Sequence, residues 1–225
     1  MFSGMKKMSQ NMNFNGIKYL IFDLDGTLVD SSDGVLQATN YALSLLGEPE
    51  RTKAEVRSFI GYPLEDMFNA FSSKSYSEFW THFQDKGREV VAASAIPVDG
   101  ADYVLHELHR RGYILGIGTT KIRIHIERIL AKHGWQDLIK AYAGADEVNA
   151  VKPAPEVFLK VRTLLGGGNS DTLIVGDTAN DVLAARGAGL PVIGLISPFG
   201  RVDDLKKSSP DLIIDSLTEL LEILP

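Results

Sequence analysis

Two aspartates that directly follow a short apolar run constrain this chain more than any other feature of its sequence. Residues 19–22 read Tyr-Leu-Ile-Phe, and Asp23 and Asp25 come next, followed by Gly26 and Thr27. Such a run is typical of a buried strand in a parallel sheet, and open α/β sheets bind ligands at the carboxyl ends of their strands. Because strand residues i and i+2 share a face, the two carboxylates are expected to point to the same place.

This arrangement of two carboxylates needs a physical reason. Two like charges repel by roughly 4 kcal/mol at about 4 Å and an effective dielectric constant near 20. A fold tolerates this only where a cation, a proton or a function requires it. Taken alone, the stretch is equally well interpreted as an acidic turn after a strand, because Asp-Gly is common turn chemistry.

Length and composition set the class of protein. The 225 residues are enough for one large domain or for a domain with a smaller insert, and the apolar content of 44% and charged content of 23% are those of a globular protein. The net charge of −6 argues against nucleic acid or an anionic membrane as a partner. The absence of cysteine excludes thiolate metal sites and fits a cytoplasmic location. No apolar run approaches the ~20 residues of a membrane-spanning helix, and residues 1–16 are expected to form a frayed polar tail.

The chain divides into a helical section and a section of alternating strands and helices. Between the first strand and residue 96 only helical patterns occur, over residues 33–46, 52–60, 64–71 and 76–93. From there on, strands are predicted over residues 113–118, 141–144, 173–176, 191–195 and 212–214, with helices over 101–111, 122–133, 155–165, 180–188 and 217–224. Repeated β-α-β units imply an α/β fold with a doubly wound parallel sheet and helices on both faces.

Polar residues stand at the ends of several predicted strands. Thr119 follows the strand over 113–118, and Asp177 follows the strand over 173–176, with Asp181 one helical turn later. Since all carboxyl ends of a parallel sheet lie at one edge, these side chains can meet Asp23 and Asp25 there. Several aspartates without thiols or paired histidines suit a hard cation, of which Mg²⁺ is the default.

Lys152 lies between prolines in Val-Lys-Pro-Ala-Pro, so a stiff backbone presents its side chain. Beside a cluster of aspartates such a lysine offsets charge and can bind a phosphoryl oxygen. Taken one by one, Thr119 is more often a plain strand-end residue, Lys152 a solvated loop charge, and Asp177 a helix N-cap. Their joint order and their places at strand ends favour a functional site.

These elements, in this order, resemble the motifs of the haloacid dehalogenase superfamily of phosphohydrolases. Residues 23–27 match its first motif, Asp-x-Asp-Gly-Thr, Thr119 matches its second, Lys152 its lysine motif, and residues 176–181 its acidic motif. The resemblance covers nearly the whole chain from Tyr19 onward. It implies that the helical section is a C1-type cap over residues 31–96, inserted into a core made of residues 1–30 and 97–225.

The resemblance also implies catalytic roles. Asp23 would attack phosphorus and form an aspartyl-phosphate, and Asp25 would protonate the leaving oxygen and then activate water. Thr119 and Lys152 would hold the phosphoryl oxygens, with Thr120 beside them as a further substrate-binding residue.

The same resemblance implies a Mg²⁺ site. The ion would be bound by Asp23, by the backbone carbonyl of Asp25 and by Asp177, with Asp181 as a ligand or as a neighbour that orients the ligands.

Residues that differ from the motifs of related enzymes limit which activities the chain is expected to have. Asp25 argues against dehalogenation, because the dehalogenases of this superfamily lack that second aspartate. The related sugar-phosphate mutases carry an arginine three residues after the cap-loop glycine, where this chain has Leu64. Close phosphatase relatives usually have asparagine where this chain has Thr120.

The cap is expected to choose the substrate, with Gly61 and Tyr62 facing the site as substrate-binding residues. Residues 28–31 and 184–192 look like the phosphoglycolate phosphatase-like branch. The sequence thus predicts a Mg²⁺-dependent phosphomonoester hydrolase of a small phosphorylated metabolite, phosphoglycolate first, acting as a monomer or homodimer. The alternatives are a sugar-phosphate mutase such as a beta-phosphoglucomutase-like enzyme, a pyrophosphatase, or a non-catalytic phosphate-binding protein.

Overall fold

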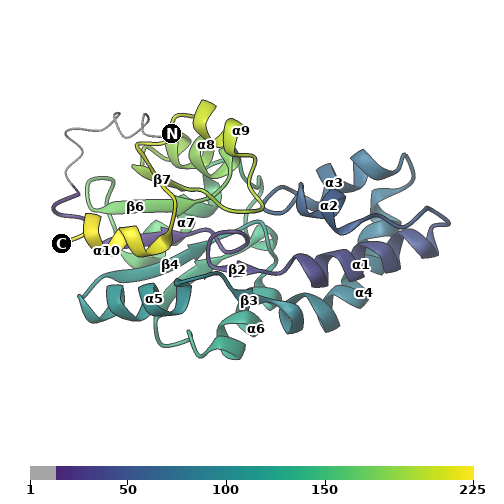
Figure 1. Ribbon diagram of the computed structural model, residues 1–225, viewed down its shortest axis with the longest axis horizontal. Coiled ribbons are helices and arrows are strands. Elements are labelled where there is room, and N and C mark those ends of the chain that lie inside the picture. Colours follow the sequence, from purple (N-terminus) through teal and green to yellow (C-terminus); the bar gives the residue numbers. More distant parts are fainter. Residues whose placement is uncertain (1–13) are drawn as a thin grey trace, which may run out of the picture.

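A parallel sheet of six strands forms the centre of the protein in the computed structural model, which describes residues 14–225 (Figure 1). The strands lie in the order β5-β4-β1-β6-β7-β8. Their bounds are β1 Tyr19–Phe22, β4 Ile114–Gly118, β5 Ile139–Ala143, β6 Thr172–Gly176, β7 Val192–Leu195 and β8 Leu212–Ile214. The chain runs outward from β1 in one direction to β4 and in the other to β6, so the strand order reverses at β1, where open α/β sheets bind ligands.

Alternating burial of β1 builds the two faces of the sheet. Leu20 and Phe22 pack into one apolar layer, beneath α5 (Ala101–Arg110) and α6 (Arg123–His133). Tyr19 and Ile21 pack into the opposite layer, beneath α7 (Glu156–Leu165) and α8 (Ala179–Gly187). A strand without an exposed face must be apolar throughout, which is why residues 19–22 carry no polar side chain at their centre. The predicted doubly wound α/β fold is confirmed.

Four helices form a separate layer to the right of the sheet in Figure 1: α1 (Ser32–Leu45), α2 (Lys53–Arg57), α3 (Leu64–Phe71) and α4 (Tyr76–Ser94). They have an apolar core of their own, in which the rings of Phe68 and Phe79 stack with centroids 4.6 Å apart. Gly34 permits the close approach of α1 and α4, since a Cβ there would lie 2.6 Å from the carbonyl oxygen of Val90.

The two passages between this helical layer and the sheet pair with each other. β2 (Val29–Asp30) and β3 (Ile96–Pro97) form a two-stranded antiparallel ribbon, so the chain leaves and re-enters the core at one place. This pairing supports our proposal that residues 31–96 are a cap and that residues 1–30 and 97–225 are the core.

Several sequence predictions are corrected by the structure. The ribbon β2–β3, α9 (Val202–Lys207) and the 3-10 turn η1 (Ala145–Glu147) were not predicted, and the last helix is a 3-10 turn η2 (Leu217–Glu219) followed by a short α10 (Leu220–Ile223). The predicted tail over 1–16 lies mostly outside the described residues, but Phe14 is buried in the main core. The helix over 64–71 and the strands over 19–22 and 212–214 occur as predicted, and the other predicted elements occur with shifted ends.

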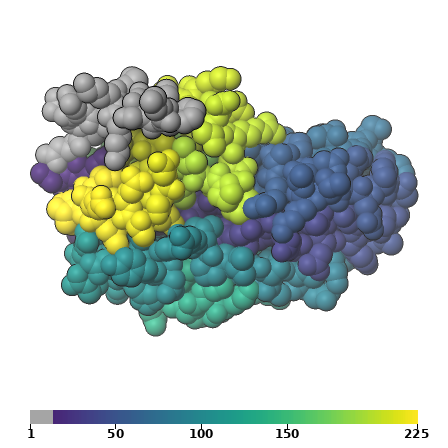
Figure 2. Space-filling view, viewed as in Figure 1, coloured from purple at the N-terminus to yellow at the C-terminus, as the bar shows by residue number. Residues whose placement is uncertain are grey.

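Figure 2 shows the blue cap lying against yellow-green residues of the core near α9. The guanidinium of Arg201 lies 5.0 Å from the ring centroid of Tyr62 and donates a hydrogen bond of 3.3 Å to the carbonyl oxygen of Ser58. Conversely, an arginine of the cap contacts a ring of the core: the guanidinium of Arg57 lies 4.4 Å from the ring centroid of Phe199. These contacts hold the helical layer against the core.

Candidate active site

Parallel register brings the strand ends together. Phe22 pairs with Ile117 of β4 and with Val175 of β6, so the residues that follow these three strands emerge at one edge of the sheet. Asp23, Thr119 and Asp177 all lie at this edge, and each is 1% exposed or less.

Lys152 reaches the same place from the loop before α7 and is completely buried. Its Nζ lies 2.6 Å from Asp23 Oδ1 and 2.6 Å from Asp181 Oδ1, and it donates to the carbonyl oxygen of Gly118 at 3.2 Å. The alternative interpretation of Lys152 as a solvated loop charge is therefore wrong. All three of its protons have an acceptor, which fixes the ammonium beside one oxygen of Asp23.

The electrostatics of this pair depend on burial. Burial disfavours the ammonium of Lys152, but the carboxylates of Asp181 and Asp23 outweigh that effect and raise its pKa. Burial raises the pKa of Asp23 to about 7, with Lys152 opposing and Asp181 reinforcing the rise. Burial and the carboxylates of Asp181 and Asp23 also raise the pKa of Asp177 well above its usual value. The protein alone thus holds more buried negative charge than Lys152 balances.

The carboxylate of Asp177 is held in place from two loops. Its Oδ1 accepts a hydrogen bond of 3.0 Å from Thr27, and its Oδ2 accepts one of 2.6 Å from Ser197. Gly26, with a φ of +85°, lies so close that a Cβ at this position would overlap the carboxylate. The glycine of the first motif is therefore required both for its backbone conformation and for the space that it leaves.

Asp181 orients its neighbours from the first turn of α8. Its Oδ2 accepts hydrogen bonds from the backbone nitrogen and the hydroxyl of Thr178, at 3.0 and 2.6 Å. Thr178 in turn accepts from the backbone nitrogen of Asp181, so the two residues form a capping box. The N-cap of α8 is Thr178 and not Asp177, which leaves the Asp177 carboxylate free of a capping role.

A divalent cation fits the acidic cluster. One carboxylate oxygen from each of Asp23, Asp177 and Asp181 lies within 4.8 Å of the others. Asp23 Oδ2 is buried and has no hydrogen-bond partner among residues 14–225. An all-oxygen donor set of this kind suits Mg²⁺, and the unpaired Asp23 Oδ2 shows that the cluster can accept a further partner.

Asp25 turns away from this cluster and has partners that sequence reasoning missed. Its Oδ2 lies 2.9 Å from Nζ of Lys121, and its Oδ1 accepts a hydrogen bond from Ser31. Lys121 also donates to Ser31 Oγ at 3.0 Å, and both residues are buried. The two aspartates of the first motif thus have different counter-charges: Lys152 for Asp23 and Lys121 for Asp25. The only sequence signal was the place of Lys121, two residues after Thr119 in the loop that follows β4.

The two threonines after β4 lie between these groups. Thr119 is buried, and its hydroxyl accepts a long hydrogen bond of 3.3 Å from the backbone nitrogen of Lys121. Thr120 is half-buried and lines the cavity in front of Asp25. Both predicted residues therefore lie at the site.

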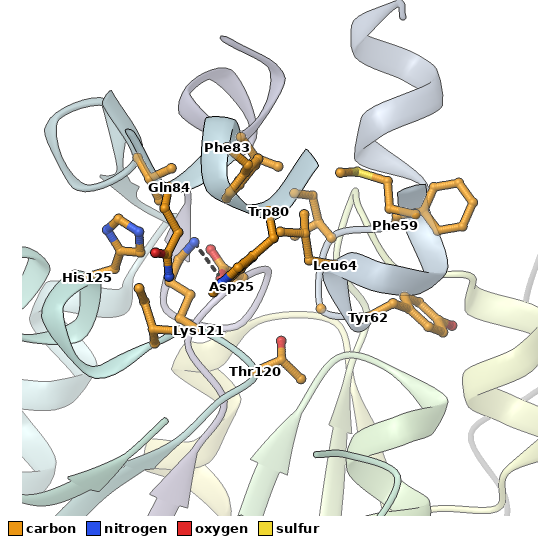
Figure 3. A pocket seen from close by; sticks show the side chains of 16 residues that line it. Asp25, Phe59, Tyr62, Leu64, Trp80, Phe83, Gln84, Thr120, Lys121 and His125 are labelled. Atoms are coloured by element: carbon orange, nitrogen blue, oxygen red, sulfur yellow. Dashed lines mark ion pairs between the residues drawn. The ribbon is translucent and has the colours of Figure 1, made fainter. Parts of the chain in front are cut away.

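The cavity lies between cap and core and has a volume of about 90 Å³ (Figure 3). Asp25, Lys121 and Thr120 form its core side, and cap side chains close it from above. Most of the latter are apolar: Val35, Ile60, Leu64, Met67, Trp80, Phe83 and Val91.

The cap loop meets the core beside the acidic cluster. Gly61 has a φ of +83°, and a Cβ there would lie 2.7 Å from Thr178 Cγ2. Tyr62 lines the cavity, but Figure 3 shows its ring directed away from Asp25. Its ring packs under the guanidinium of Arg201, as described above. The backbone of the loop at Gly61 thus lies against Thr178, beside the acidic cluster.

Comparison with known proteins identifies the family. Residues 20–195 match the model of the family described as haloacid dehalogenase-like hydrolase. A phosphoglycolate phosphatase of Vibrio parahaemolyticus is 31% identical, with 94% of this chain and 98% of that protein covered. The pyrophosphatase PpaX of Anoxybacillus flavithermus is 30% identical, with 95% and 98% covered. This chain belongs to the haloacid dehalogenase-like hydrolase family.

Within that family the chain is a phosphatase. A protein of Dickeya dadantii named probable phosphatase IndB is 32% identical over 90% of this chain and 91% of its own length. A solved haloacid dehalogenase-like hydrolase from Streptococcus pneumoniae superposes with a TM-score of 0.85, at 28% identity over 93% of this chain and 99% of that one. The resemblance seen in the sequence motifs is thereby confirmed. Within residues 14–225, no helix has the length and apolar character needed to cross a membrane.

Proposed function

We propose that this phosphatase is a Mg²⁺-dependent hydrolase of small phosphate monoesters that acts through an aspartyl-phosphate on Asp23. The observation that carries the proposal is the asymmetry of the Asp23 carboxylate. Lys152 holds Oδ1 at 2.6 Å, while Oδ2 is buried and has no partner among the described residues. A carboxylate fixed by one oxygen has the other available, in a site with few alternative nucleophiles.

The reaction runs in two steps on the residues of this chain. A carboxylate oxygen of Asp23 attacks phosphorus, the bond from phosphorus to the ester oxygen breaks, and Asp25 donates a proton to the leaving alcohol. Asp25 then takes a proton from water, whose oxygen attacks the same phosphorus and releases phosphate from Asp23. Asp25 suits both steps because it stands apart from the acidic cluster and lines the cavity.

Other side chains hold the phosphoryl group. Lys152 is placed to neutralise the charge of the phosphoryl oxygens. The hydroxyl of Thr119 and the polar loop that follows Thr119 would hold the same group from the side of β4. Asp23 and Asp177, with the backbone carbonyl of Asp25, would hold Mg²⁺, which supplies charge neutralisation to the phosphoryl oxygens. Asp181 has both oxygens engaged, by Lys152 and by Thr178, which supports an orienting role for it.

Phosphoglycolate is the first candidate substrate, because the cavity beside Asp25 is small and a relative over nearly its full length bears the name phosphoglycolate phosphatase. Pyrophosphate is the second candidate, on the name of another relative. The mutase reading is weaker, since Leu64 lines the cavity where an arginine would be needed to clamp a second phosphate. A cytoplasmic location and a monomeric or homodimeric state belong to the same proposal.

The test is turnover of a phosphometabolite panel with Mg²⁺, by wild type and by Asp23→Asn. Asp137→Asn, at an exposed position in the loop after α6, is the matched control. We expect phosphate release by wild type and by the control, and loss of at least 10³-fold in Asp23→Asn. Equal turnover by wild type and Asp23→Asn would remove the nucleophile assignment. Isomerisation of a sugar phosphate without phosphate release would favour a mutase.

A further inference from the structure

His125 is a buried histidine at the cavity that the proposed mechanism does not use. It lies in the first turn of α6, is 5% exposed, and lines the cavity together with Lys121 and Gln84. Its Nδ1 is fully buried and has no hydrogen-bond partner among residues 14–225. Buried polar atoms are normally paired, so an unpaired imidazole nitrogen at the wall of a substrate cavity indicates a partner that arrives with the substrate.

The charges around His125 are positive. Lys121 lines the same cavity, and the exposed Arg128 and Arg88 lie near enough to act on the ring. Burial, followed by these three cations, lowers the pKa of His125 to about 3. The ring is therefore neutral near pH 7, with one nitrogen donating and one accepting. A neutral donor in a positive surrounding favours an anionic acceptor over a neutral one.

The dimensions of the cavity limit the size of that partner. Its volume of about 90 Å³ favours a small partner. Figure 3 shows Asp25 joined to Lys121 on the core side, with His125 and Gln84 beside Lys121 and with Trp80 and Phe83 above. A leaving group released at Asp25 therefore enters a cavity that Lys121 and His125 line.

We propose that His125 is a specificity-determining residue, which donates a hydrogen bond to a carboxylate at the far end of a short leaving group. Lys121, beside it, attracts the same carboxylate. This inference rests on the proposed phosphatase reaction at Asp23 and adds how the enzyme recognises the part of the substrate that is not phosphate. The substrate class is a phosphate ester of a short hydroxy acid.

The test compares three esters of similar length that differ in the far group: phosphoglycolate, 2-hydroxyethyl phosphate and ethyl phosphate. The proteins are wild type, His125→Phe, His125→Asn and His125→Gln. Asn places an amide near the position of Nδ1 and Gln near that of Nε2, whereas Phe keeps the bulk of the ring without a donor. His109→Phe, at an exposed position on α5, is the matched control.

We expect wild type to prefer phosphoglycolate over both other esters in kcat/KM. His125→Phe is expected to reduce that preference at least tenfold and to change ethyl phosphate turnover by less than threefold. Either Asn or Gln should recover part of the preference, and the one that does identifies the ring nitrogen involved. Affinities of phosphoglycolate and ethyl phosphate for Asp23→Asn, with and without His125→Phe, give a readout that does not need turnover.

Three results would overturn the inference. They are an equal loss for all three esters in His125→Phe, a wild-type preference for 2-hydroxyethyl phosphate, and equal affinities of phosphoglycolate and ethyl phosphate for Asp23→Asn. Each can occur while ester hydrolysis by wild type is intact. Conversely, selective binding of phosphoglycolate without hydrolysis of any ester would support His125 and contradict the proposed function.

Discussion

Lys152 and Asp23 are 129 residues apart in the sequence and form a fully buried ion pair, with 2.6 Å between Nζ and Oδ1. Asp181 completes the arrangement on the other side of the ammonium, also at 2.6 Å. The pair joins the end of β1 to the loop before α7 and to α8. One lysine thus links three separate segments of the chain at the place where the sheet order reverses.

Replacing Lys152 by Met should both destabilise the protein and abolish activity. The substitution leaves two buried carboxylates without a counter-charge, and breaking a buried pair in this way costs about 3–5 kcal/mol. Urea unfolding measures the loss, and Mg²⁺ should restore part of it. Lys160→Met, which removes a half-exposed ion pair with Glu147, should cost less than about 1 kcal/mol. A Lys152→Met protein as stable as Lys160→Met would show that the buried pair contributes little.

The stability of the protein without Mg²⁺ should fall as pH rises. Burial raises the pKa of Asp23 from 3.8 to about 7 in the folded state, and that of Asp177 also rises. Between these pH values the folded protein retains a proton that the unfolded chain has lost, so stability is greatest at the acid end of this window and declines through it. Mg²⁺ replaces the proton as counter-charge and should therefore raise Tm more at pH 8 than at pH 5.

Thermal unfolding in EDTA and in Mg²⁺ at the two pH values measures this difference. Asp177→Asn removes one carboxylate of the cluster and should reduce the Mg²⁺ effect at pH 8, whereas Asp137→Asn should not. An identical rise in Tm at pH 5 and pH 8 would contradict the assignment of the buried acids as the Mg²⁺ site.

The convergence of Asp23, Thr119 and Asp177 could be predicted because it follows from topology alone. Apolar periodicity marks the strands, and the carboxyl ends of parallel strands share one edge. The position of the Asp25 carboxylate could not be predicted in this way. Its partners, Lys121 and Ser31, depend on the paths of two loops, and nothing in their spacing shows that the paths cross.

The contacts between cap and core were missed for a similar reason. A ribbon of two-residue strands such as β2–β3 has no periodicity to detect, and α9 has only six residues. The ring of Tyr62 packs against Arg201, which lies beyond β7 in the sequence. Contacts of this kind come from packing between distant segments, which a local pattern does not encode.

Replacing Lys121 by Met should slow the chemical step with little effect on the Mg²⁺ site. Lys121 and Ser31 hold the Asp25 carboxylate, and proton transfer by a well-placed acid is worth about 10²–10⁴-fold in rate. We expect kcat to fall by about 10–100-fold with ethyl phosphate, which lacks a carboxylate and so isolates this effect from substrate recognition. Lys140→Met, at an exposed position on β5, is the control. Unchanged kcat with ethyl phosphate would show that Asp25 transfers the proton equally well without Lys121.

Removing Arg57 and Arg201, two of the arginines that join cap and core, should favour the open state. Arg201 of the core lies over Tyr62 of the cap, and Arg57 of the cap lies over Phe199 of the core. Each contact of this kind at a partly exposed site is worth about 0.5–1 kcal/mol. Because closure completes the cavity around Asp25, Arg57→Ala and Arg201→Ala should each raise KM about two- to fivefold, and the double variant should raise it by about the product of the two factors.

Trp80, which lines the cavity, reports closure through its fluorescence when a substrate analogue binds to the Asp23→Asn variant. Arg186→Ala, which removes an ion pair with Asp211 within the core, should leave KM and the fluorescence change as in wild type. If KM and the fluorescence response of the double variant match those of Arg186→Ala, these arginines do not control closure of the cap.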